Sequence, residues 1–357
     1  MKDNRSLEPL YQYASAHRFG EFDRLFSELR HTLPPDALWE AYLMRAQIKL
    51  YAADISALED LEQAGKIDGQ PQFSLLGAHW KVDAPNRFIV FPRQPGALEQ
   101  FVACLPAIRE WLERWYGPQG SALVRQVQCE AHYYRGEVQA ALKLAEEPEP
   151  AEWVSYGDAM LAACMRFRCY LALEQPQKAE QCMLDIIRLS RSHPECVAAY
   201  QSFRGWASIT TSWNGDSPRF CAGSCGENLP VLDDRLDYIR YGSSQTTPLE
   251  KPFVDYAGQS YGDAYALRHC YMDSLHAMYW WSAGDYGQMA AYFDRLYQVA
   301  QASGVSMPLV EYGEQITPLL QYIKDSGFDC SHQWIDDVTA RARQYEKCLN
   351  RYRDSDI

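Results

Sequence analysis

The residues best suited to chemistry are two histidines and an aspartate in the segment RHCYMDSLH. His269, Asp273 and His276 are spaced so that they share one face of a helix. Two imidazoles and a carboxylate could bind Zn²⁺ or another divalent ion. The alternative is that they line a groove between helices and hydrogen-bond to their neighbours. Because no further ligand follows at a matching spacing, we favour this alternative and predict no metal site and no cofactor.

Two cysteines, Cys221 and Cys225, lie four residues apart in the irregular segment CAGSCG. A zinc site would need a second Cys/His pair, and the sequence shows none at matching spacing. Redox sensing would need a basic group beside the thiol, and Arg219 is the only close candidate. The segment GSCG also lacks the strand-turn-helix context of a nucleophile elbow. The sequence therefore predicts that the chain is not an enzyme.

Polar and aromatic side chains within otherwise apolar helical segments point to recognition instead. A polar side chain in such a helix is costly to bury unless it has a partner or faces a groove. The alternative is core packing for the aromatic residues and ion pairs inside the helical stack for the charged ones. The residues that we expect to contact a ligand or partner are Arg125, Gln128, His132, Tyr133, Arg166, His269, Asp273 and His276.

These helices must be positioned by sharp turns, and one turn pattern recurs along the chain. The segment YYRGEVQAAL has Gly136 between two helical patterns, and HRFGEFDRLF and SAGDYGQMAA have Gly20 and Gly284 at the same place. Ala53 and Glu174 take this place in two degraded copies. Glycine can adopt the left-handed conformation that ends a helix, and the acidic residue after it can cap the next one. Some copies are about 33 to 40 residues apart, which is typical of helical-hairpin repeats.

A helical hairpin cannot bury its apolar stripe alone, so such hairpins stack into a solenoid. Val124, Val127, Ala131 and Tyr134 form one apolar stripe, and residues 158–173 are apolar nearly all round. Strand signals are nearly absent, with RFIVF (Arg87–Phe91) as the one candidate. We therefore predict an all-α helical-hairpin solenoid, a single domain over residues 1–357 with irregular insertions at about 66–96 and 212–230.

Composition limits the partners. The formal charge of -13 disfavours direct nucleic-acid binding and anionic membrane surfaces. The N-terminus has no apolar signal-peptide core, and no uncharged run is long enough to span a bilayer. We therefore expect cytoplasmic residence, in which the 11 cysteines are buried, reduced thiols.

Three segments together resemble a known family. They are FIVFPRQPGALEQFV, the hairpin YYRGEVQAALKLAEE, and the C-terminal run SMPLVEYGEQITPLLQYI followed by ARARQYEKCL. In this order they resemble the TPR-like superhelical sensor region of LuxR-family, MalT-type ATP-dependent transcriptional regulators, over about Tyr11 to Tyr352. The resemblance implies a TPR-like, right-handed superhelix. It also implies a region that receives an inducer or a protein signal, between a P-loop ATPase and a DNA-binding helix-turn-helix.

The chain departs from the full pattern of that family at both ends. It has no G-x-x-x-x-G-K-[ST] motif, and it stops at YEKCLNRYRDSDI, where the DNA-binding module would begin. ATP hydrolysis and DNA binding are therefore not assigned to it, whether it is an isolated sensor or a piece of a longer protein. We expect it to bind a small-molecule effector or a regulatory protein or peptide on its concave face, with self-association possible. The alternative is a free-standing TPR-like adaptor for protein–protein interaction.

Overall fold

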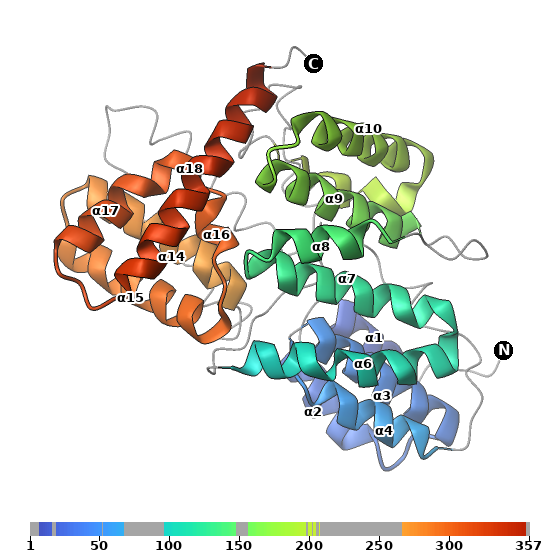
Figure 1. Ribbon diagram of the computed structural model, residues 1–357. Coiled ribbons are helices and arrows are strands. Elements are labelled where there is room, and N and C mark those ends of the chain that lie inside the picture. Colours follow the sequence, from blue (N-terminus) through green and yellow to red (C-terminus); the bar gives the residue numbers. More distant parts are fainter. Residues whose placement is uncertain are drawn as a thin grey trace.

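The computed structural model is built from helices joined by tight turns (Figure 1). It describes residues 7–15, 19–51, 53–67, 96–147, 156–197, 199–201, 203, 204, 207 and 266–354. No strand occurs among these residues, so the predicted all-α fold class is confirmed for them. The strand candidate Arg87–Phe91 and the segment with Cys221 and Cys225 lie outside the described residues.

The described residues up to Cys196 form successive helical hairpins. The N-terminal helices are α1 (Glu8–Ser15), α2 (Phe19–Leu29), α3 (Pro35–Tyr51), α4 (Ala57–Gly65) and α6 (Ala97–Tyr116). The central hairpins, as we call α7 to α10, comprise α7 (Pro118–Tyr134), α8 (Val138–Ala145), α9 (Tyr156–Ala172) and α10 (Pro176–Ser192), with the short η2 (Pro194–Cys196) after them. Each central helix packs against the next, as expected for a stack of hairpins.

Left-handed residues end the helices at four of the five predicted turns. Gly136 and Gly284 have φ of 81° and 79°, and Ala53 and Glu174 have φ of 51° and 55°. The predicted turn at Gly20 is wrong, because α2 already begins at Phe19 and places Gly20 inside the helix. Gly20 is therefore a helical residue and does not have the left-handed conformation of the other turn glycines.

The predicted apolar stripes form the core. Val124, Val127, Ala131 and Tyr134 of α7 are all buried. Helix α9 is buried on nearly every side because α8, α10 and a C-terminal helix all contact it. Around α1 and α2 a smaller second core gathers about Phe22 and Phe26.

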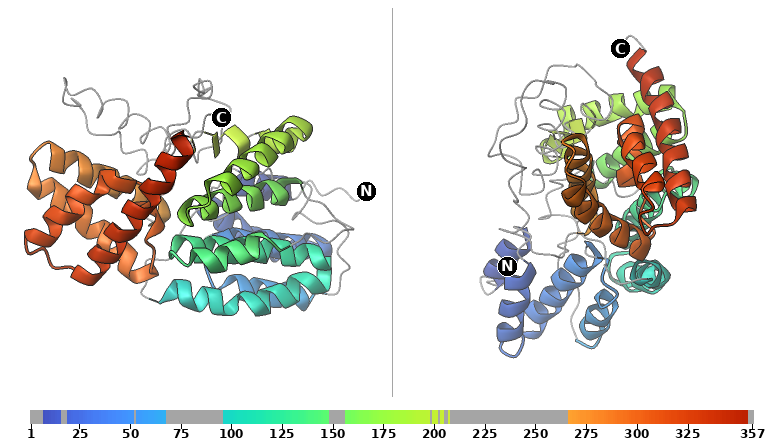
Figure 2. Two further views of the ribbon diagram at one scale, coloured as in Figure 1. Left: turned by 45° about the horizontal axis from the view of Figure 1, so that its top comes forward. Right: turned by 90° about the vertical axis from the view of Figure 1, so that its left-hand side faces the viewer.

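The C-terminal helices pack back against the central hairpins. They are α14 (Ala266–Ser282), α15 (Tyr286–Ser303), α16 (Met307–Val310), η4 (Gly313–Ile316), α17 (Thr317–Asp325) and α18 (His332–Asp354). Figures 1 and 2 show them in orange and red beside the green central hairpins. Helix α16 contacts α7, and α18 contacts both α9 and α10. In a simple solenoid, each repeat contacts only its neighbours in the sequence. The contacts of α16 and α18 with the central hairpins join distant segments and are an addition to that pattern.

Candidate functional site

A buried carboxylate lies where the central hairpins meet the C-terminal helices, a contact that we call the junction (α7, α9 and α10 against α14, α16 and α18). Glu311 follows α16 directly and is only 1% exposed. Oη of Tyr133 donates a hydrogen bond to its Oε1, and Oη of Tyr271 donates one to its Oε2. The donor–acceptor distance is 2.7 Å in both. A buried carboxylate is tolerated only with such donors. The side chain of Glu311 therefore links α7, α14 and α16.

A buried arginine supplies the balancing charge. Arg168 of α9 is 3% exposed, and its Nη1 donates to Oη of Tyr134 over 3.0 Å. Burial lowers the pKa of Arg168, but Tyr134, Glu311 and neighbouring tyrosines raise it, so that it lies well above its ordinary value. The guanidinium therefore stays charged. The junction therefore contains a buried cation and a buried anion, and each of them is hydrogen-bonded to a tyrosine hydroxyl.

Three tyrosines at the junction, Tyr133, Tyr271 and Tyr312, act as hydrogen-bond donors. Burial and then the charge of Glu311 raise the pKa of Tyr133 well above its ordinary value. Burial likewise raises the pKa of Tyr134. Oη of Tyr312 donates to the backbone oxygen of Tyr271 over 3.0 Å. The hydroxyls of Tyr133 and Tyr134 therefore keep their protons, and that of Tyr133 donates to Glu311.

Of the residues expected to bind a ligand, Tyr133 takes part in this network. Arg125 and Arg166 come together elsewhere, at the C-terminal end of α8. Nη1 of Arg166 donates to the backbone oxygen of Ala145 over 2.9 Å, and Nη1 of Arg125 lies 4.0 Å from Oε2 of Glu147. A helix C-terminus carries partial negative charge that favours cations. These contacts match the alternative of ion pairs and hydrogen bonds inside the stack.

His132 and Gln128 take no part in those two contacts. Nδ1 of His132 is 2.5 Å from Oε2 of Glu137, whose Oε1 also lies 3.1 Å from Nη2 of Arg135. Glu137 therefore makes no side-chain cap for α8, contrary to its predicted role. Gln128 is half-buried on α7. The two residues are thus part of the hairpin surface rather than of the junction.

Asp273 and His276 are brought together on the α14–α15 hairpin. Nη2 of Arg295 donates to Oδ1 of Asp273 over 2.8 Å, so this carboxylate is already engaged. The imidazole of His276 stacks on Tyr292 with ring centroids 4.5 Å apart. The side chain of His269 lies outside the described part. Among the described residues, no group of three or more His, Cys, Asp or Glu side chains is arranged to hold a metal ion.

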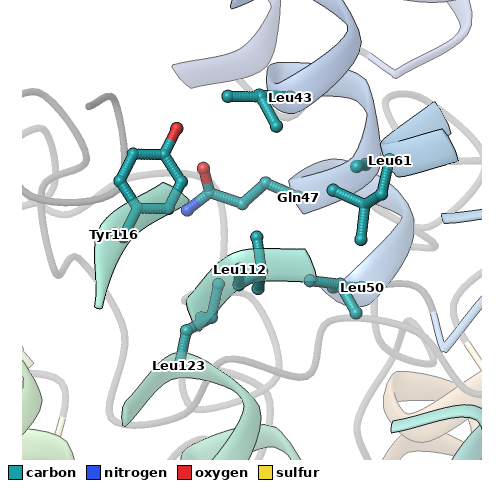
Figure 3. Close-up of a pocket in the computed structure, with 8 residues that line it drawn as sticks. Leu43, Gln47, Leu50, Leu61, Leu112, Tyr116 and Leu123 are labelled. Atoms are coloured by element: carbon teal, nitrogen blue, oxygen red, sulfur yellow. The ribbon is translucent and has the colours of Figure 1, made fainter. Parts of the chain in front are cut away.

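A small cavity between α3, α4, α6 and α7 is lined mainly by leucines (Figure 3). Gln47 extends across it towards Tyr116, whose Oη is buried without a hydrogen-bond partner in the described structure. The cavity volume is about 10 Å³, room for about one water molecule. An effector of several atoms does not fit there, so the cavity is not the predicted effector site.

The sequence pattern does not single out Glu311 or Tyr271 as site residues. The signal for Glu311 is its position in SMPLVEYG, where apolar residues surround a lone carboxylate. Such an acid must find donors in the interior. Its partners, Tyr133 and Tyr271, lie 178 and 40 residues away along the chain. The sequence near Glu311 does not indicate which residues they are.

None of the described helices is both long and apolar enough to cross a lipid bilayer. A scan of the sequence against protein-family models found no match, and a search of curated proteins found none either.

Proposed function

We propose that the chain is the signal-sensing, TPR-like region of a LuxR/MalT-type transcriptional regulator, without catalytic activity of its own. It would bind a small effector or a regulatory protein on its concave face. The observation that supports this proposal most is the junction, where the C-terminal helices meet the central hairpins through the Glu311 network. The resemblance of the repeat segments to that family supplies the biological role.

A polar junction suits a receptor because it can repack between discrete arrangements. Directional hydrogen bonds at a joint favour a defined register, as buried polar groups do in some other systems. Rigid-body movement about such an interface is a common route for signal transfer. A ligand with a higher affinity for one arrangement shifts the population towards it. The position of α18 relative to α9 and α10 would then report binding.

The alternative role, a free-standing protein-binding adaptor, is favoured by one surface feature. Tyr156 at the start of α9 is 39% exposed and stacks on His193 after α10. Val197, beside them, is 38% exposed. Sγ of Cys196 donates to the backbone oxygen of Tyr156, which joins the two segments. Exposed aromatic and aliphatic side chains close to one another are typical of protein–protein contacts.

The proposal is tested by a thermal-shift screen against sugars, nucleotides, amino acids, organic acids and aromatic metabolites. A ligand at about 100 times its Kd stabilises the native state by about 2.7 kcal/mol, which raises the Tm by a few degrees. For each hit, amide hydrogen exchange should slow in α16 and α18 as well as at the contact residues. A screen without any saturable hit would count against the effector sensor, and affinity capture of a protein partner would then support the adaptor.

A further inference from the structure

Two turns lie against each other at the edge of the junction. One is the α7–α8 turn, Arg135 to Glu137, and the other is the α15–α16 turn, Gly304 to Ser306. The backbone N–H of Ser306 donates to the backbone oxygen of Tyr134 over 2.8 Å. Nε of Arg135 lies 3.6 Å from the point that a Cβ on Gly304 would occupy. The two turns therefore form one continuous patch of surface.

Arg341 of α18 reaches into this patch. A Cβ on Gly136 would overlap its Nη1 and would lie 3.2 Å from its Cζ. The arginine is half-buried, yet its one hydrogen bond in the described structure is from Nε to the backbone oxygen of Asp337, at 3.5 Å. No carboxylate of the described residues lies within ion-pair distance of it. Burial lowers the pKa of Arg341 more than Asp337 raises it.

A second unpartnered group lies beside the guanidinium. Oγ of Ser306 would be 3.0 Å from the same Cβ position on Gly136. Ser306 is 2% exposed, and its hydroxyl has no hydrogen-bond partner among the described residues. Most buried polar side-chain atoms do have a partner. A half-buried cation without an anion and a buried hydroxyl without an acceptor thus lie next to each other.

We propose that Arg341 and Ser306 bind the carboxylate group of a small acidic effector at this patch, an inference that rests on the proposed function. The guanidinium offers a planar fork of N–H donors that matches the two oxygens of a carboxylate. The hydroxyl of Ser306 can rotate to donate to one of them. Because Arg341 is partly exposed, its guanidinium can meet the ligand from solvent. Oγ of Ser306 is closed off from solvent in this arrangement, so the guanidinium must shift outward for the carboxylate to reach it as well.

The local charges favour a singly charged carboxylate over a phosphate. Arg135, whose side chain lies against Gly304 in the same patch, is already paired with Glu137 at 3.1 Å. Asp337 lies close to Arg341 on the same helix. One unpaired guanidinium can balance one negative charge, whereas a dianion would keep an excess charge beside these acids. The overall charge of -13 adds to this repulsion.

The test uses acetate, benzoate and succinate as probes, with inorganic phosphate and benzamide as comparisons and chloride to match ionic strength. Binding is measured by calorimetry and by the side-chain NMR signal of Nε–H of Arg341. We expect at least one carboxylate to bind saturably and to shift that signal. Arg341→Gln should weaken its Kd at least tenfold, and Ser306→Ala should weaken it several-fold. Arg343→Gln, on the exposed side of the same helix, is the matched control and should leave Kd unchanged.

The site is overturned if no carboxylate binds above the chloride control, or if phosphate binds more tightly than every carboxylate. It is also overturned if Arg341→Gln and Arg343→Gln have equal effects. Should a sugar, nucleotide or other compound from the wider screen bind without needing Arg341, the receptor function stands and this site alone is wrong. Arg341→Lys keeps the positive charge but removes the planar set of N–H donors. We expect this variant to lose less affinity for the carboxylate than Arg341→Gln does.

Discussion

Gly136 meets two constraints, a left-handed backbone and the close approach of Arg341. Gly284 has nearly the same φ, but a Cβ on it would have nothing within 4 Å. We expect Gly284→Ala to lower the free energy of unfolding by about 1–2 kcal/mol, the cost of a left-handed non-glycine residue. Gly136→Ala should cost more, because its methyl group must also displace the guanidinium. Urea unfolding of the two variants measures the difference.

The double variant Gly136→Ala/Arg341→Ala identifies the source of that difference. If the clash is responsible, the cost of Gly136→Ala in the Arg341→Ala background falls to that of Gly284→Ala. Equal costs for the two single glycine variants would mean that Arg341 moves aside freely.

Glu311 holds the junction together through its charge and its two acceptor oxygens. In Glu311→Gln the amide nitrogen faces a tyrosine hydroxyl that already donates, and buried Arg168 loses its balancing charge. We expect a loss of about 3–5 kcal/mol in the free energy of unfolding, because the buried charge of Arg168 loses the nearby negative charge that favours it. Glu314→Gln, an exposed neighbour, should change it by less than about 0.5 kcal/mol. Similar small effects for both variants would show that the junction does not depend on the carboxylate.

At the scale of the helices, the acidic residue after each turn has more than one role. Oδ1 of Asp285 accepts from the backbone N–H of Gln288 over 3.0 Å and caps α15, as predicted. We expect Asp285→Ala to cost about 1 kcal/mol, with little dependence on salt. Glu137→Ala removes only partly exposed ion pairs, so its cost should be below about 1 kcal/mol and should shrink at high salt. The Tm of each variant, measured at low and at high salt, distinguishes the helix cap of Asp285 from the ion pairs of Glu137. If the loss of Tm depended on salt equally in both variants, this assignment of roles would be wrong.

The degraded turn at Glu174 offers a gain in stability. Glu174 ends α9 with φ of 55°, a conformation that glycine adopts at lower cost. We expect Glu174→Gly to be more stable than Glu174→Ala by about 1 kcal/mol, since both variants lose the same carboxylate. Ala53→Gly should gain less, because Ala53 is 2% exposed and its methyl group packs in the core. Chemical denaturation of Glu174→Gly and Glu174→Ala measures the difference in the free energy of unfolding. If the alanine variant were as stable as the glycine variant, the left-handed conformation would not limit stability at this turn.

These turns show why the hairpins could be predicted from the sequence and the junction could not. The turns at Gly136, Gly284, Ala53 and Glu174 depend on the backbone of one residue and on apolar spacing nearby, which the sequence displays directly. The contact of Tyr133 with Glu311 depends on how helices 178 residues apart are brought together. Arg125 and Asp273 stood out as polar residues in apolar helices, but the same pattern fits a residue with a partner inside the stack. Only the tertiary structure distinguishes those cases.

At the scale of the whole molecule, most of the cysteine thiols among the described residues are buried weak acids. Burial raises the pKa of several of them above the ordinary 9.0. They are Cys129, Cys164, Cys169, Cys182, Cys196 and Cys270. For Cys196 the pKa rises to about 11. Burial also raises the pKa of buried tyrosines such as Tyr133 above the ordinary value of 10.0.

These shifts predict that stability falls at alkaline pH. Above about pH 9 the unfolded chain releases thiol protons that the folded chain retains, so the unfolded state binds fewer protons and the free energy of unfolding decreases as pH rises. Each fully buried thiol contributes about 1.4 kcal/mol per pH unit, and the tyrosines add to the slope above pH 10. The Tm, measured under reducing conditions from pH 8 to 11, should therefore fall steeply. Cys164→Ala is less stable at pH 8 but should show a shallower fall. A flat profile would mean that the thiols ionise inside the folded protein.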